Sequence, residues 1–328
     1  MEFRTTVSPL SGAPFGISHS DRILMLGSCF SDNIGERLEA GLFNVVANPF
    51  GQLYNPLSIA RALSLLALGG KLSGTDLFLH NGLWNSWMFH SSFSSSDPDR
   101  ALSAMNSAIE EGTAQLRKAS VVIITLGNSR GYSLHGGGPV VANCHKVPQS
   151  EFETFSLSPD QTADALRQCA RAIAGVNRDA KIILTVSPIR HTAYGLHGNN
   201  LGKASLLLGA DTFVSENPDT AVYFPAFEIM TDDLRDYRFY TADMKHPSPV
   251  AADYIYEIFG KSFFSTSSLA LAGECRSLTR RLLHRPIATA AELLDSEAAM
   301  RNSLKQQLLA LHPEIGEALE RFVKKHNR

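Results

Sequence analysis

The 328-residue sequence has few charged residues and only four cysteines, and it contains no long apolar run. Charged residues make up 19% of the chain against 44% hydrophobic residues, which favours a large buried core and argues against disorder. The formal net charge is -2, and no block of about five basic residues occurs. The electrostatic signature of a nucleic-acid-binding protein is therefore missing, and we expect no nucleic-acid partner.

No stretch approaches the roughly 18 consecutive apolar residues that a membrane span requires, and residues 1–6 lack the charged-then-apolar pattern of a secretion signal. The cysteines form no CxxC pair and show no regular spacing: Cys29, Cys144, Cys169 and Cys275. In a chain of this size that usage indicates reduced thiols. We therefore expect a cytoplasmic protein that makes no membrane contact.

Short apolar runs, each stopped by a turn residue, have the composition of buried parallel strands: 22–26, 121–126 and 181–186. Helical patterns lie between them, for example at 57–68 and 163–174, and two further strands are expected at 44–47 and 221–224. This alternation predicts an α/β protein with a central parallel sheet covered by helices on both faces.

Two stretches interrupt the alternation. Residues 78–97 carry both tryptophans in an irregular pattern, and residues 130–148 hold three consecutive glycines between apolar runs, which predicts a β-hairpin. Ligands of open α/β sheets lie beyond the carboxyl ends of the strands, so we expect these insertions to roof that crevice. After a serine-rich segment the composition becomes helical. We predict a core domain over 1–264 and a helical appendage over 265–328, which serves packing or the formation of a homo-oligomer.

The first strand ends in Gly27-Ser28-Cys29-Phe30, and a helix follows at once. Glycine permits a sharp turn there, and a nucleophile placed next would lie at a helix N-terminus. Such a position lowers the pKa of a thiol, which makes Cys29 a candidate nucleophile. The alternative is structural: Ser28 or Ser31 caps the helix, and Cys29 is a buried filler.

A second polar group lies far down the chain. Asp243 precedes His246 by three residues in a loop, and Ser248 and Pro249 then begin the last core helix. This spacing allows the carboxylate to contact one imidazole nitrogen and leaves the other free as a general base. Because Asp and His are common before helix caps, the pair alone is a weak signal.

The order of these two motifs resembles that of the SGNH (GDSL-like) hydrolases. More specifically, the chain resembles the GSCFA family, whose motif stands here as Gly27 to Ser31. The resemblance covers roughly residues 20–262 and continues through several further segments: 48–59, 142–146, 185–191, 223–225 and 234–240. It implies a flavodoxin-like three-layer α/β/α fold.

The resemblance also implies an oxyanion hole next to the nucleophile. Alignment on the superfamily's Gly-Asp-Ser motif puts Cys29 at the nucleophile, with Ser28 as the alternative. The backbone N–H groups of Cys29 and Gly51 would stabilise the oxyanion. The third donor is a side chain, either Asn128, which stands one place early for the superfamily pattern, or Asn143 from the hairpin.

Other polar residues are expected near the same crevice, as substrate contacts or as structural hydrogen-bonding groups: His191, Arg190, His145 and His90. No HxH or HExxH spacing occurs, so neither a metal nor another cofactor is expected.

Together, the motifs and the resemblance predict an esterase that acts on O-acyl, acetyl-like esters of a glycan or a small metabolite. An O-acyltransferase that uses the same residues is the first alternative, and the insertions would then make room for an acyl carrier such as coenzyme A. A non-catalytic binding or scaffold module on the same fold is the second alternative.

Overall fold

The computed structural model describes residues 5–284 and 291–326, and for residues 291–298 it describes the backbone alone. Its centre is a five-stranded parallel sheet in the order β10-β9-β5-β1-β2. The strands are β1 (Arg22–Gly27), β2 (Asn44–Ala47), β5 (Val121–Leu126), β9 (Lys181–Val186) and β10 (Ala221–Tyr223). All five lie where the sequence predicts them, to within one residue, and the predicted α/β class is confirmed.

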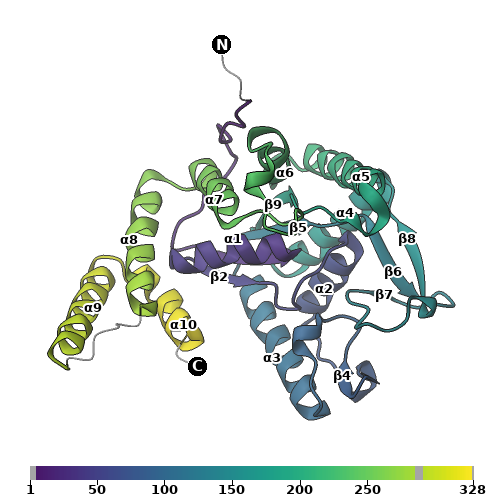
Figure 1. Cartoon of the computed structure of the whole chain (residues 1–328), viewed down its shortest axis with the longest axis horizontal. Coiled ribbons are helices and arrows are strands. Elements are labelled where there is room, and N and C mark those ends of the chain that lie inside the picture. Colours follow the sequence, from purple (N-terminus) through teal and green to yellow (C-terminus); the bar gives the residue numbers. More distant parts are fainter. Residues whose placement is uncertain (1–4, 285–290, 327–328) are drawn as a thin grey trace.

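Helices cover both faces of this sheet, which gives three layers (Figure 1). Side chains of β1 alternate between the layers: Leu24 and Leu26 point into one apolar cluster, Ile23 and Met25 into the other. The first cluster is closed by α2 (Pro56–Leu68), α3 (Pro98–Leu116), α4 (Pro159–Val176) and α5 (Gly195–Glu216). The second is closed by α1 (Cys29–Ala40), α6 (Ala226–Glu228) and α7 (Pro249–Phe263).

The strand order fixes where a ligand binds. Counted along the chain, the five strands lie in the doubly wound order 2-1-3-4-5. The order reverses between β1 and β5, because the chain first runs outward from β1 to β2 and then returns to the other side of β1. A crevice opens at the carboxyl ends of the two strands that flank such a reversal. The residues that follow Gly27 and Leu126 stand at this point.

The hairpin predicted over 130–148 is present as β6 (Arg130–Leu134) and β7 (Val140–Val141). A third antiparallel strand, β8 (Phe152–Ser156), pairs with the other side of β6 and was not anticipated. The stretch over 78–97 contains a smaller hairpin, β3 (Phe78–His80) and β4 (Leu83–Asn85).

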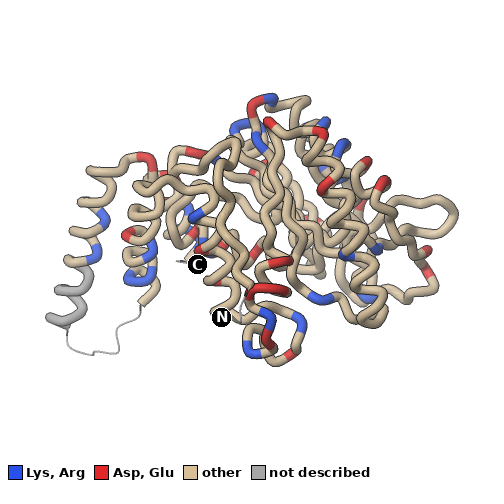
Figure 2. The backbone as a smooth tube through the Cα atoms, turned by 90° about the horizontal axis from the view of Figure 1, so that it is seen from above, with Lys and Arg blue, Asp and Glu red and all other residues tan. Residues whose placement is uncertain are grey.

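Three helices follow the core: α8 (Thr266–Leu283), α9 (Ala291–Leu311) and α10 (Gly316–His326). They lie at the end of the molecule opposite the β6–β8 hairpin (Figures 1 and 2). Their own apolar cluster includes Leu42 from the loop before β2, which joins them to the core.

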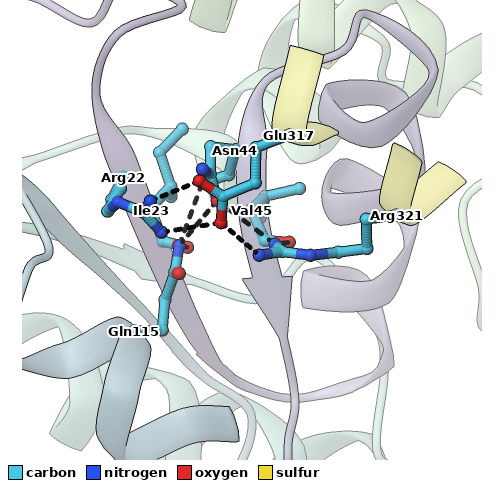
Figure 3. Close-up of polar contacts among 7 residues, drawn as sticks. All are labelled: Arg22, Ile23, Asn44, Val45, Gln115, Glu317 and Arg321. Carbon is cyan, nitrogen blue, oxygen red and sulfur yellow. Dashed lines mark hydrogen bonds and ion pairs between the residues drawn. The ribbon is translucent and has the colours of Figure 1, made fainter. Parts of the chain in front are cut away.

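The last helix seals the edge of the sheet. Arg321 on α10 donates to Val45 O at 3.0 Å and to Asn44 Oδ1 at 3.2 Å, both on the edge strand β2. Glu317, one turn earlier, pairs with Arg22 of β1 (Figure 3). Arg321 therefore occupies a backbone carbonyl of the edge strand, Val45 O, that would otherwise be open to another strand.

Charges of both signs are interspersed along the chain (Figure 2). Within the part of the chain that the structure describes, no helix is both long and apolar enough to cross a bilayer.

Candidate active site

The turn after β1 is shaped by close contact with β5. Gly27 has φ +151°, and a Cβ atom at this position would lie 2.3 Å from the carbonyl oxygen of Thr125. Its N–H donates to Asn48 Oδ1 at 2.8 Å, so a second loop holds the turn in place. Only glycine fits here, and the chain passes directly from the strand into α1.

Ser28 and Cys29 have different environments. Ser28 is fully buried, and its Oγ accepts a hydrogen bond from Phe30 N at 3.3 Å, as an N-cap does. Cys29 is the first residue of α1 and is half-buried. It lines a cavity of about 460 Å³, which Ser28 does not line. The N-cap interpretation therefore describes Ser28, and the thiol of Cys29 is the one that reaches the cavity.

The expectation of a lowered thiol pKa at Cys29 is wrong for this structure. Burial raises the pKa of Cys29, and the Asp32 carboxylate in the same helical turn adds to this. The Tyr54 hydroxyl beside the sulfur, the backbone N–H of Cys29 itself and the Lys203 ammonium act in the opposite direction but do not outweigh it. The helix N-terminus is thus present, but Cys29 is a thiol that needs a base.

The loop before α7 holds Asp243 against His246. Asp243 Oδ2 lies 2.5 Å from His246 Nδ1, the contact that their spacing predicts. Asp243 Oδ1 accepts from Thr241 Oγ1 at 2.7 Å, from Lys245 N at 2.9 Å and from His246 N at 3.1 Å. These hydrogen bonds, that of Thr241 above all, hold the pKa of Asp243 well below its usual range. An ionised carboxylate therefore orients the imidazole.

His246 lines the same cavity as Cys29. Among the described residues, the Nε2 atom of His246 makes no hydrogen bond, and no hydrogen bond joins the Cys29 sulfur to the His246 imidazole. The site therefore presents a free imidazole nitrogen and a thiol around one cavity. Catalytic hydrogen bonds are often long without substrate and shorten in its complex.

Of the expected oxyanion donors, three lie at the cavity: Cys29, Asn128 and Asn143. The N–H of Cys29, at the start of α1, has no partner within the helix. Asn128 Oδ1 accepts from Arg130 N at 3.1 Å, and in the described part of the chain its Nδ2 amide donates to nothing. Gly51 does not line the cavity, and its N–H donates to Asn48 O at 2.7 Å, so the expectation that it serves as an oxyanion donor is wrong.

The expected substrate contacts divide in the same way. His191 and Arg190 line the cavity, whereas His145 and His90 do not. His145 is buried, with Nε2 2.9 Å from Ser86 O, and His90 Nδ1 accepts from Ser92 N at the start of a short turn. The expectation that both insertions roof the crevice is therefore wrong for one of them. Residues of the 130–148 insertion line the cavity, whereas no residue of 78–97 does. The 78–97 insertion contacts the other insertion instead, because Ala142 N donates to Trp87 O at 2.7 Å.

Sequence reasoning missed Lys203. This residue of α5 is 3% exposed, and its Nζ donates to Gly127 O and Ser187 O, each at 2.7 Å. It therefore bridges the chain at the carboxyl ends of β5 and β9. Burial lowers the pKa of Lys203 to about 7. A signal was present: Lys203 shares a helical face with buried residues at the usual spacing, namely Asn199, Leu206 and Ala210.

His191 lies next to this lysine. Burial lowers the pKa of His191 to about 4, and the Lys203 and His246 charges contribute in the same direction. Its Nε2 atom is buried without a hydrogen-bond partner in the described structure. His191 is therefore a neutral imidazole at physiological pH.

No group of three or more His, Cys, Asp or Glu side chains able to hold a metal occurs among the described residues.

Two comparisons with known proteins bear on this site. A search of curated proteins finds no match to the chain. The sequence profile of the GSCFA family matches residues 22–259, from the first residue of β1 into α7, and so includes Cys29, Lys203, Asp243 and His246. The match spans well over half of the chain, and the protein belongs to the GSCFA family.

Proposed function

We propose that this protein is an acyl enzyme that cleaves an O-acyl ester through a thioester on Cys29. The observation that carries the proposal is a single cavity lined by the Cys29 thiol and by an imidazole, His246, whose other nitrogen is held by an ionised carboxylate. Acyl transfer of this kind requires a nucleophile, a general base and a carboxylate that orients the base. The layout also resembles that of the SGNH hydrolases.

Acylation starts from the protonated thiol. As Cys29 Sγ attacks the ester carbonyl carbon, His246 Nε2 takes the thiol proton and Asp243 stabilises the imidazolium. The carbonyl electron pair moves to oxygen, where the Cys29 N–H and the Asn128 amide donate hydrogen bonds. The oxyanion then collapses, the C–O bond to the alcohol breaks, and the leaving oxygen takes the proton from His246.

Deacylation repeats these steps with another oxygen nucleophile. Water gives an esterase, which is our primary proposal, and an acceptor hydroxyl gives an O-acyltransferase. His246 takes a proton from the incoming oxygen and returns it to the Cys29 sulfur when the thioester bond breaks. The substrate class suggested by the resemblance is an O-acetyl-like ester of a glycan or a small metabolite.

The test is intact-protein mass spectrometry after brief exposure to a panel of activated acetyl esters and acetyl-coenzyme A. Wild type is compared with Cys29→Ala, Ser28→Ala and Cys144→Ala. The last is a matched control, because Cys144 is the second thiol that lines this cavity. We expect one acetyl group on wild type, on Ser28→Ala and on Cys144→Ala, and none on Cys29→Ala.

An adduct that persists in Cys29→Ala and disappears in Ser28→Ala would transfer the role to Ser28. An adduct retained by both variants, or its absence from wild type with every ester, would refute the proposal and favour a non-catalytic binding module. Product release with and without a sugar acceptor separates hydrolysis from transfer.

A further inference from the structure

Three cationic side chains line the cavity: Arg130, Arg190 and Lys245. Among the residues that the structure describes, no Asp or Glu side chain lines it. Within the described residues none of the three forms an ion pair, whereas Arg37 and Arg167 elsewhere on the surface each pair with a carboxylate. A protein of net charge -2 thus collects three uncompensated positive charges around one cavity.

The two guanidinium groups are held in place. The Arg130 guanidinium lies 4.1 Å from the centre of the Tyr194 ring, and that of Arg190 lies 5.5 Å from the centre of the Tyr240 ring. Stacking of this kind restricts the side chain and leaves the N–H donors at its edge free. Less entropy is therefore lost when a ligand binds.

The cations come from different segments that the fold brings together. Arg130 begins β6, and Arg190 follows β9. Arg190 N donates to the carbonyl oxygen of Lys245 at 3.2 Å, which ties this arginine's loop to the loop of the Asp243–His246 pair. The nearest carboxylate on that loop, Asp243, is already engaged by four hydrogen-bonding contacts. Asp243 is thus directed to His246 and to its own loop, and the three cations are left to pair with an anionic ligand.

We infer that the cavity binds a small acyl ester that carries an anionic group, a carboxylate or a phosphate, recognised by Arg130, Arg190 and Lys245. The reaction of this ester rests on the proposed function, whereas its binding does not. Planar N–H donors match carboxylate and phosphate oxygens, and charge-assisted hydrogen bonds to them are the strong ones. A cavity of about 460 Å³ is in the range of small-molecule sites and has room for such an ester.

The binding arm of the test needs no catalysis. Protection of Cys29 from iodoacetamide is measured by peptide mass spectrometry with phenyl phosphate, benzoate and neutral benzamide. We expect half-maximal protection of Cys29 at a concentration of anion at least about tenfold lower than that of benzamide. This ratio of concentrations should fall about tenfold in Arg130→Gln, Arg190→Gln and Lys245→Gln. Lys71→Gln is the matched control, because this exposed lysine lies outside the cavity.

The kinetic arm compares 3-acetoxybenzoate and 3-acetoxyphenyl phosphate with the neutral methyl 3-acetoxybenzoate. All three carry the same acetyl ester on the same ring. We expect kcat/KM to be at least about tenfold higher for the anion that protects better than for the neutral ester, and the three cavity variants to lose this preference, whereas Lys71→Gln keeps it. The comparison of the two anions identifies carboxylate or phosphate as the group recognised.

The outcomes separate the two ideas. Equal protection by benzamide and the anions, or turnover of all esters without an anionic preference, overturns this inference and leaves the proposed function standing. Selective protection by anions without turnover of any ester supports the anion site and counts against the proposed function.

Discussion

Lys203→Met removes a buried amine and keeps an unbranched side chain that is one atom shorter. In the wild type this amine donates to Gly127 O and Ser187 O at 2.7 Å each. The variant leaves both carbonyl groups without these donors, at a cost of about 1–3 kcal/mol each. Part of this cost is offset, because methionine needs no desolvation of a charge. We therefore expect a destabilised but folded protein whose deficit depends on pH.

The size of that dependence follows from the pKa of Lys203, which is about 7 in the folded protein against 10.5 for an unperturbed lysine. Between these values the unfolded chain binds more protons than the folded one, so wild-type stability rises with pH, by up to about 1.4 kcal/mol per pH unit. From pH 7 to pH 9 the gain is about 2 kcal/mol. Lys203→Met lacks it, so the stability gap between the two proteins widens by about 2 kcal/mol over this range.

Urea unfolding of both proteins at pH 7, 8 and 9 measures the gap, and groups common to both cancel in the difference. Lys181→Met is the matched control, because this exposed ammonium donates to a single carbonyl, Asp219 O at 3.2 Å. The gap between Lys203→Met and wild type should widen relative to that of this control. An equal pH dependence of the two gaps would refute the reasoning, since Lys203 would then keep its ordinary pKa in the folded state.

Three further changes test other parts of the structure. Asp243→Asn should lower kcat/KM for an acetyl ester by at least about 100-fold, because the amide no longer stabilises an imidazolium at His246; a smaller loss would assign the carboxylate a structural role. Ser28→Ala should lower the free energy of unfolding by about 1 kcal/mol, seen as a lower Tm, and leave the esterase activity in place; unchanged stability would contradict the N-cap role. Arg321→Ala should cost about 1–3 kcal/mol in urea unfolding, because it leaves the edge carbonyl of Val45 without its donor, and an equal midpoint and slope would contradict this.

Most of the fold was predictable because buried parallel strands leave a local record. The runs at 121–126 and 181–186 are continuous and aliphatic, and the structure places β5 and β9 at the same residues. The Asp243–His246 contact was predictable for a similar reason, since three residues of a tight loop bring the two side chains together whatever the rest of the fold does.

What depends on distant packing was not predictable. The pKa of Cys29 follows from burial and Asp32, and the helix N-terminus visible in the sequence is outweighed. Gly51 is different, because its hydrogen bond to Asn48 O is local, and the Asn-Pro-x-Gly pattern of residues 48–51 is typical of such a turn. Lys203 stands among apolar residues of α5 at helical spacing, but its two acceptors lie 76 and 16 residues away in the chain. Only the assembled sheet brings them together.

The seal that α10 places on β2 has a consequence for biosynthesis. Residues 44–47 leave the ribosome long before Arg321, since about 275 residues must be translated between them. At roughly 5–20 residues per second this takes on the order of 14–55 s. Until then β2 lacks its contact with α10, and its outer edge is open to pairing with other strands.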